Sequence, residues 1–300
     1  MSVSKKRVPR ILFTYWSGDT LSLLHIITLR AVKLLNPSYK VILYSAKKEQ
    51  TLDRTSFNSL EHSVVFTKQY TLQTLSEDSQ IEISEIDLCA EYGIKNPLFH
   101  TFIADIVRIK KLEEHGGIWF DMDLLFLKGI SDEFLETLPQ GKSCATVSYS
   151  GTIATGFVFG FEKAELFKKL SIALNRKLKD IHTDSIITRY QALGPSLWQS
   201  FAKPYFNEAL GKHPLIHSIP KEDIYPYIWN EMNQLFLESS ECRVNDSTLA
   251  IHWYNGSSET RNFINDLYTK DLNNVGKSPM LNSLLKLRDL GVSLEEPKIV

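Results

Sequence analysis

Two aspartates that follow a short apolar run are the residues of this chain best suited to do chemistry. Asp121 and Asp123 come directly after Ile118–Phe120, and the glycine pair Gly116-Gly117 precedes that run. The run has the pattern of a short buried strand, and side chains two residues apart in an extended chain point to the same face. We therefore expect both carboxylates to share one face where the strand meets its loop. Such a pair suits a hard divalent cation that carries a phosphate-bearing substrate.

An Asp-x-Asp sequence alone is weak evidence, because aspartate is a common turn residue. Two solvated aspartates that end a strand are the simplest alternative. The preceding segment adds to the signal, since the apolar positions of Leu98–His115 predict an amphipathic helix that packs on a sheet. This helix carries Asp105 and Arg108 about one turn apart. As a surface ion pair they would contribute only about 0.2–0.5 kcal/mol, whereas a guanidinium also suits sugar or phosphate oxygens.

The order and spacing of these residues resemble those of a known enzyme family. The resemblance is carried by Ala104-Asp105-Ile106-Val107-Arg108, then Leu112, then Gly116-Gly117-Ile118-Trp119-Phe120-Asp121-Met122-Asp123. This string is similar to the family-32 glycosyltransferases, whose sugar-binding region contains a DXD motif, and to the glucosyltransferase domain of the large clostridial cytotoxins. The resemblance implies a catalytic set of Asp121, Asp123, Asp105 and Arg108.

The same resemblance implies a role for each member of this set. Asp123 would bind a Mn²⁺ or Mg²⁺ ion directly, and Asp121 would bind the ribose or the sugar and contact the ion through water. Asp105 and Arg108 would exchange hydrogen bonds with the hydroxyls of the donor sugar. A bound cation would act as a Lewis acid on the leaving diphosphate.

Trp16 ends the first predicted strand, Arg10–Trp16. A helix from Leu23 and a second strand over Tyr39–Tyr44 follow, which together make a βαβ unit and predict a parallel pair of strands. In such sheets ligands bind at the carboxyl ends of the strands. Taken alone, Trp16 is most simply a core or rim aromatic. The resemblance implies that its ring stacks on the uracil of a UDP-sugar, an interaction of about 1–3 kcal/mol in nucleic-acid systems.

Further candidate ligands lie in a polar loop near the C-terminal end. A predicted strand, Leu249–His252, leads into this loop, and the candidates are His252, Asn255 and Ser257. Imidazole, amide oxygen and hydroxyl are all suitable ligands of Mn²⁺, and spacing does not choose among them. The resemblance implies that the loop completes the metal shell and covers the diphosphate, with Ser257 also contacting the donor. A histidine bonded to the backbone at a strand end remains the alternative.

Thr155 marks a departure from the family pattern. It lies in the predicted strand Thr152–Phe161, where the family usually has an asparagine. A threonine hydroxyl forms a hydrogen bond but lacks the reach of an amide. We therefore treat Thr155 as a candidate contact to the donor sugar that is weaker than the asparagine it replaces.

The rest of the chain predicts an α/β protein. The resemblance implies a GT-A type nucleotide-diphospho-sugar transferase fold, with a mixed, largely parallel sheet flanked by helices. We expect a single domain over residues 1–300, with helical additions over about residues 47–98 and 161–248 and a C-terminal helix at about 278–291. A short strand is also expected over Ser63–Thr67.

Composition limits the classes of function. The net charge of −1 argues against binding nucleic acid by general electrostatics. Three widely spaced cysteines fit a reducing compartment. We expect no signal peptide and no transmembrane segment, and hence a cytoplasmic protein. The basic cluster Lys5–Arg7 is a weak signal for peripheral contact with an anionic membrane.

Together with these observations, the resemblance implies a retaining, metal-dependent glycosyltransferase. It would move a hexose or N-acetylhexosamine from a UDP-linked donor to a hydroxyl of a glycan or lipid-linked glycan, as in bacterial capsule, lipopolysaccharide or other surface glycan synthesis. A toxin-like effector that glycosylates a host protein, or a non-catalytic nucleotide-sugar-binding relative, are the alternatives. A glycoside hydrolase is disfavoured, because it needs two carboxyls about 5–9.5 Å apart on either side of a sugar.

Overall fold

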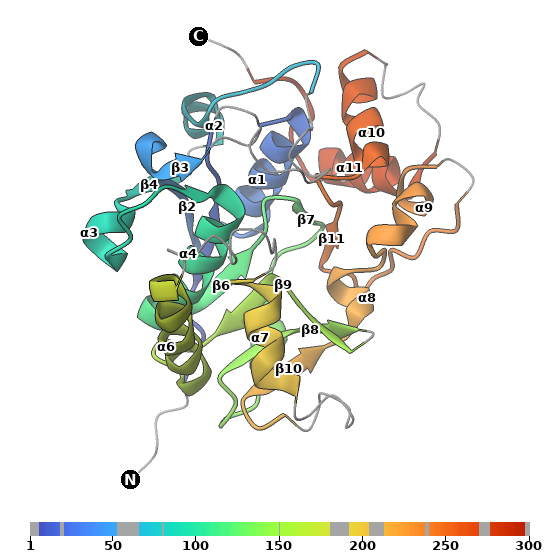
Figure 1. Cartoon of the computed structure of the whole chain (residues 1–300). Coiled ribbons are helices and arrows are strands. Elements are labelled where there is room, and N and C mark those ends of the chain that lie inside the picture. The colour runs from blue at the N-terminus through green and yellow to red at the C-terminus, as the bar shows by residue number, and fades with distance from the viewer. Residues whose placement is uncertain are drawn as a thin grey trace.

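A mixed seven-stranded sheet runs through the molecule in the order β10-β8-β9-β6-β1-β2-β4 (Figure 1). The computed structural model describes residues 6–18, 21–52, 66–79, 81–149, 151–180, 192–203, 213–237, 240–269 and 277–297 of the 300-residue chain. The strands of the sheet are β1 (Ile11–Tyr15), β2 (Lys40–Ala46), β4 (Glu82–Ile86), β6 (Gly117–Phe120), β8 (Cys144–Tyr149), β9 (Thr152–Gly160) and β10 (Ile216–Ile219).

Helices and short strands surround this sheet. The helices are α1 (Leu23–Leu35), α2 (Leu72–Ser79), α3 (Leu88–Tyr92), α4 (His100–His115), α5 (Asp132–Glu136), α6 (Glu165–Asp180), α7 (Pro195–Ala202), α8 (Lys221–Ile224), α9 (Met232–Phe236), α10 (Ser258–Thr269) and α11 (Pro279–Asp289). The remaining elements are β3 (Thr51–Leu52), β5 (Leu98–Phe99), β7 (Leu124–Phe126), β11 (Ala250–His252) and the 3₁₀ turns η1 (Lys48–Gln50) and η6 (Trp229–Glu231).

The pairing of the strands confirms the predicted mixed, largely parallel sheet flanked by helices. β1 pairs in parallel with β2 and with β6, β2 pairs in parallel with β4, and β10 pairs in parallel with β8. Within this sheet, β9 runs antiparallel to its neighbours β6 and β8. Because Phe13 of β1 lies opposite Trp119 of β6, the carboxyl ends of these two strands meet at one edge. Trp16 and Asp121 therefore extend from neighbouring strands.

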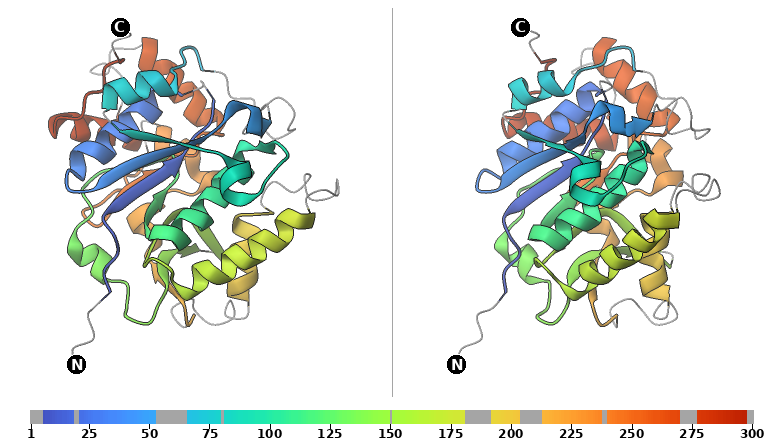
Figure 2. Two further views of the ribbon diagram at one scale, coloured as in Figure 1. Left: turned by 90° about the vertical axis from the view of Figure 1, so that its left-hand side faces the viewer. Right: turned by 60° about the vertical axis from the view of Figure 1, so that its left-hand side comes forward.

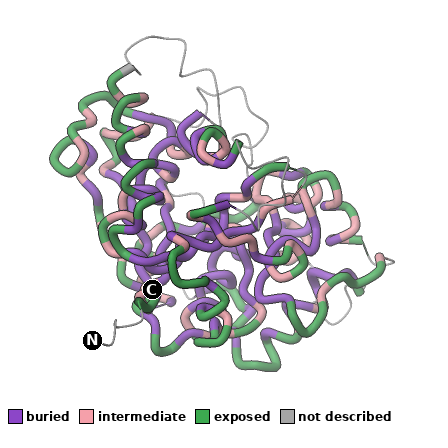
Figure 3. Tube along the Cα trace, turned by 90° about the horizontal axis from the view of Figure 1, so that it is seen from below, coloured by how far each residue is buried: buried purple, intermediate pink, exposed green. Residues whose placement is uncertain are grey.

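The helices pack on the sheet through continuous apolar surfaces. α4 packs against β1, β6 and α6, while α7 packs against β9 and α6. α1 packs against β7, α2 and α10. Figure 2 shows α4 and α6 in front of the strands, with the red C-terminal helices in the upper part of the view. Buried residues run through the middle of this arrangement and exposed ones around it (Figure 3). Among the described residues, no helix is both long enough and apolar enough to cross a membrane.

Several expected elements differ from those observed. The helix expected over Leu98–His115 begins at His100, because Leu98 and Phe99 form β5 and pair with β3. Of the strand expected over Ser63–Thr67, residues 63–65 lie outside the described residues, and Phe66 and Thr67 are in no strand. The two segments expected to add helices also supply edge strands, β4 and β10, to the central sheet.

The glycine pair between α4 and β6 explains how the chain turns so sharply before the aspartates. Gly116 has φ +64° and Gly117 has φ +90°, which side-chain-bearing residues rarely adopt. A Cβ on Gly117 would lie 2.7 Å from the carbonyl oxygen of Ile11, and one on Gly116 would meet the backbone nitrogen of Glu162. The two glycines therefore allow α4 to end close to β1 and allow β6 to begin at the second glycine.

Candidate functional site

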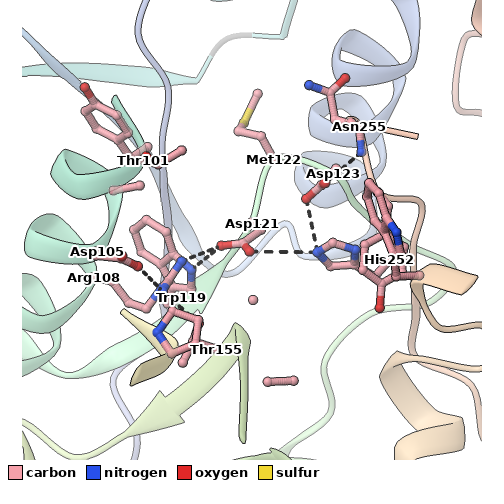
Figure 4. A pocket seen from close by; sticks show the side chains of 18 of the residues that line it. Thr101, Asp105, Arg108, Trp119, Asp121, Met122, Asp123, Thr155, His252 and Asn255 are labelled. Atoms are coloured by element: carbon pink, nitrogen blue, oxygen red, sulfur yellow. Dashed lines mark hydrogen bonds and ion pairs between the residues drawn. The ribbon is translucent and has the colours of Figure 1, made fainter. Parts of the chain in front are cut away.

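Asp121 and Asp123 converge on His252 at the carboxyl end of β6 (Figure 4). The Nε2 atom of His252 lies 3.2 Å from Asp123 Oδ1 and 3.8 Å from Asp121 Oδ2. His252 belongs to β11, which pairs antiparallel with β7 and places His252 opposite Leu124. A strand far along the chain thus brings the imidazole to the two carboxylates.

The two aspartates share a face for a different reason from the one predicted. They lie in the turn between β6 and β7, where the backbone N–H of Leu124 donates to the carbonyl of Asp121 at 3.0 Å. The expectation that an extended strand aligns them is therefore wrong. Because the chain turns here, the position of each carboxylate depends on its hydrogen bonds and not on strand alternation.

Each carboxylate uses one oxygen to hold its position. Asp121 Oδ1 accepts hydrogen bonds from Trp119 Nε1 at 2.7 Å and from Arg108 Nη2 at 3.0 Å. Asp123 Oδ2 accepts from the backbone N–H of Asn255 at 2.9 Å. The other oxygen of each aspartate faces His252. The carboxylates are therefore fixed before any ligand binds, which lowers the entropic cost of binding.

The converging atoms fit a divalent cation. One ligand atom from each of Asp121, Asp123 and His252 lies within 4.8 Å of the other two. Carboxylate oxygens with one imidazole nitrogen suit Mn²⁺. The side chains of Asp121 and Asp123 remain 29% and 19% exposed, so the site opens onto a cavity.

The electrostatics of the two aspartates differ. Burial raises the pKa of Asp121, but the positive charge of Arg108 and the nearby His252 outweigh burial and hold that pKa well below its usual range. Burial raises the pKa of Asp123. The negative charge of Asp121 raises this pKa further, whereas His252 lowers it. The two carboxylates thus carry unequal affinities for a proton, as expected of like charges that share one site.

Arg108 is the buried centre of the hydrogen bonds behind Asp121. Its Nη1 donates to Asp105 Oδ1 at 2.8 Å and to Thr155 Oγ1 at 2.9 Å, and its guanidinium lies 4.7 Å from the centre of the Trp119 ring. The side chains of Arg108 and Asp105 are only 6% and 8% exposed. The alternative of a surface ion pair is therefore wrong. Both guanidinium ends are already bonded to protein, so Arg108 holds Asp121 in place.

The loop after β11 brings one of its two remaining candidates to the site. Asn255 lines the cavity, and its Oδ1 is buried with no hydrogen-bond partner among the described residues. Ser257 does not line this cavity. Its hydroxyl donates to Thr260 Oγ1 at 2.8 Å and accepts from the Thr260 N–H at 3.0 Å. Ser257 therefore stabilises the start of α10 in this conformation.

Three groups that position the site were not singled out from the sequence. Trp119 bonds Asp121, and the Tyr225 ring stacks on His252 with centroids 5.2 Å apart and planes at 24°. A Cβ on Gly156 would lie 2.8 Å from Asp121 Oδ2 and 3.2 Å from His252 Nε2. A glycine inside a predicted strand often marks a close approach, so Gly156 was the one detectable signal.

The cavity at this site has a volume of about 380 Å³ and is large enough for a small ligand. Trp16, Asp105, Arg108, Asp121, Asp123, Thr155, His252 and Asn255 all line it. The Trp16 ring lies 4.5 Å from the ring of His25, which Ser22 bonds at the start of α1. The structure therefore gathers every candidate except Ser257 around one space, with Trp16 on its wall.

Part of the chain matches the model of a known protein family. Residues 25–143 match the model of the family described as "Glycosyltransferase sugar-binding region containing DXD motif". The match includes Asp105, Arg108, Asp121 and Asp123 and excludes Trp16 and the His252 loop. No curated protein sequence matches the chain.

Solved structures with a similar fold are glycosyltransferases of low sequence identity. The PaToxG glycosyltransferase is 14% identical with a TM-score of 0.46, over 69% of this chain and 71% of that one. The UDP-bound glycosyltransferase domain from the YGT toxin is 10% identical with a TM-score of 0.43, over 72% and 80%. GlyE from Streptococcus pneumoniae TIGR4 is 14% identical with a TM-score of 0.37, over 88% and 64%. With TM-scores below 0.5, these likenesses support no conclusion about this chain.

The space at Gly156 generates a first prediction. Gly156→Ala should push a methyl group against Asp121 and His252 and weaken Mn²⁺ binding by about 10–100-fold, the usual cost of disturbing the groups around a metal ligand. Calorimetric titration with Mn²⁺ measures this. Glu165→Ala is the control, because the Glu165 side chain is 62% exposed and does not line the cavity. Equal affinity in the two variants would contradict the proposed geometry.

Asp105 generates a prediction about pH. Burial raises the pKa of its carboxyl to about 7, against the opposing charge of Arg108. A carboxyl with a raised pKa in the folded state contributes its full stability only at pH values below its pKa in the unfolded chain. That contribution is lost as the pH rises through the folded-state pKa of about 7.

The free energy of unfolding of wild type should therefore fall relative to that of Asp105→Asn between pH 4 and pH 8. The expected slope is up to about 1.4 kcal/mol per pH unit. Urea unfolding at several pH values measures it, with the exposed Asp132→Asn as control. A pH-independent difference between wild type and Asp105→Asn would show that Asp105 does not titrate as described.

Proposed function

We propose, from the membership of residues 25–143 in the family of DXD-containing glycosyltransferase sugar-binding regions, that this glycosyltransferase is metal-dependent and retaining. It moves a hexose or N-acetylhexosamine from a nucleotide sugar, UDP-linked as the resemblance implies, to a hydroxyl of a glycan or lipid-linked glycan. We take residues 1–300 as one GT-A type domain. The three sparse cysteines favour the cytoplasm, where bacterial surface glycans are assembled.

The observation that carries this proposal is the convergence of Asp121 Oδ2, Asp123 Oδ1 and His252 Nε2. These residues, with the buried Asn255 Oδ1, would hold Mn²⁺ or Mg²⁺. Ser257 is left out, because its hydroxyl is bonded to Thr260. When bound, the cation supplies Lewis-acid stabilisation of the charge that grows on the leaving diphosphate.

The surrounding residues position the donor. Trp16 offers an aromatic face to the base, and Asp105 and Thr155 line the part of the cavity next to Arg108. Arg108 holds Asp121 and places a fixed positive charge in a dry environment beside the diphosphate, where such a charge stabilises the transition state most. We assign no enzyme nucleophile. The leaving diphosphate accepts the proton of the acceptor hydroxyl.

Loss of a metal ligand gives the most direct test of activity. Asp123→Ala should reduce Mn²⁺-dependent hydrolysis of a UDP-sugar by more than about 100-fold, while the circular dichroism spectrum stays that of wild type. Asp132→Ala is the control, since Asp132 is an exposed acid paired with Arg10. Wild-type hydrolysis by Asp123→Ala would refute the site, and a wild type that hydrolyses no donor would favour a non-catalytic relative.

The stacking role of Trp16 gives a separate prediction for nucleotide binding. Trp16→Ala should weaken binding of UDP by about 1–3 kcal/mol, and Trp16→Phe should lose only part of that. Calorimetry with UDP, GDP and CMP in the presence of Mn²⁺ measures the effect and identifies the base. An unchanged affinity for every nucleotide in Trp16→Ala would remove Trp16 from the donor site.

A further inference from the structure

A second cavity adjoins the candidate metal site. Its volume is also about 380 Å³, and it lies between the η6–α9 segment and the beginning of α10. Trp229 and Gly256 line both cavities, so the two spaces meet at these residues. α9 and α10, neighbours in Figure 1, are held together by the Phe236 and Phe263 rings, 4.9 Å apart. The second cavity therefore lies between packed elements.

Trp229 presents an exposed aromatic ring on a fixed turn at this junction. It is 43% exposed, whereas Trp119, Trp198 and Trp253 are fully buried. The turn is held by Glu231, which accepts from the Ile228 N–H at 3.0 Å and pairs with Arg243 at 2.9 Å. An exposed ring held rigidly in this way is available to a ligand at little entropic cost.

Two ring contacts connect Trp229 to the metal-binding residues. The Trp229 ring meets the Tyr254 ring edge-on at 5.6 Å and 83°. The Tyr254 ring in turn lies 4.1 Å from the ring of His252. A molecule seated on Trp229 would therefore lie close to the donor cavity.

The polar groups of the second cavity can bond sugar hydroxyls. Asn230 and Asn233 offer amides that both donate and accept, and Glu259 offers an acceptor. Arg261 has a buried Nε with no hydrogen-bond partner among the described residues. The charges of Glu259 and Arg261 offset each other, which favours a neutral ligand. An aromatic face with a few placed polar groups is the usual composition of a small-ligand pocket.

We propose that this cavity binds the acceptor as a neutral sugar ring, with the apolar C–H face of the ring on Trp229 and its hydroxyls on Asn230, Asn233 and Arg261. The assignment rests on the proposed function, since it needs a donor in the first cavity. In the transfer, the bond from the anomeric carbon to the diphosphate oxygen breaks and a bond to the acceptor oxygen forms. The proton of the acceptor hydroxyl leaves with the diphosphate.

Kinetics with defined acceptors test this assignment. The probes are the methyl glycosides of glucose, galactose, N-acetylglucosamine and N-acetylgalactosamine, with UDP-sugars and Mn²⁺ and with products identified by mass spectrometry. Trp229→Ala should raise the KM for the glycoside by about tenfold, and Asn233→Ala by about threefold.

Leu237→Ala is the control variant. Leu237 is 55% exposed and directly follows α9 without lining either cavity. The KM of Leu237→Ala for the glycoside should therefore match that of wild type. Unchanged KM values in both Trp229→Ala and Asn233→Ala would overturn the proposal. Transfer by wild type to proteins of a cell lysate but to none of the glycosides would overturn it as well.

A binding experiment separates this proposal from the proposed function. If wild type hydrolyses no donor, the proposed function fails, and saturation-transfer NMR with the same methyl glycosides still tests the cavity. A wild-type signal that Trp229→Ala loses and Leu237→Ala keeps would support a sugar site. No signal with wild type would overturn it.

Discussion

The structure depends on two carboxylates that repel each other and are nevertheless held with one oxygen of each beside the same imidazole nitrogen. Asp121 and Asp123 approach His252 Nε2 at 3.8 and 3.2 Å. Two like charges so close need compensation in a partly desolvated site. Arg108 and Trp119 supply it to one oxygen of Asp121, and the Asn255 N–H supplies it to one oxygen of Asp123. A divalent cation between the remaining oxygens would complete this compensation.

The fold can be understood as the support for that arrangement. The glycine pair ends α4 and begins β6 within two residues, which keeps Arg108 on α4 close to Asp121 after β6. β11 pairs with β7 and brings His252 from the other side. Gly156 on β9 leaves the space that the carboxylate and imidazole occupy. Arg108 is buried and pairs with both Asp105 and Asp121, so removing both acids together would leave an uncompensated buried charge, at a typical cost of about 3–5 kcal/mol.

The local sequence pattern predicted much of the fold and of the site. It did not predict the features that depend on contacts between distant segments of the chain. The βαβ start and the helix before the aspartates follow from apolar periodicity, and the mixed sheet from the family resemblance. Periodicity could not show that Asp121 and Asp123 lie in a turn, because apolar Leu124–Phe126 continues the strand-like pattern beyond them. Nor could it show that the Ser257 hydroxyl bonds Thr260 at the start of α10, since Ser257 lies in a polar loop sequence that suits a ligand equally well.

We expect His252 and the two aspartates to hold one cation together. Pulsed electron paramagnetic resonance of the protein loaded with Mn²⁺ tests it most directly, because a coordinated imidazole nitrogen couples to the electron spin of the ion. A nitrogen coupling should appear in wild type and disappear in His252→Ala. A Mn²⁺ ion bound to wild type without any nitrogen coupling, or a coupling that survives in His252→Ala, would contradict it.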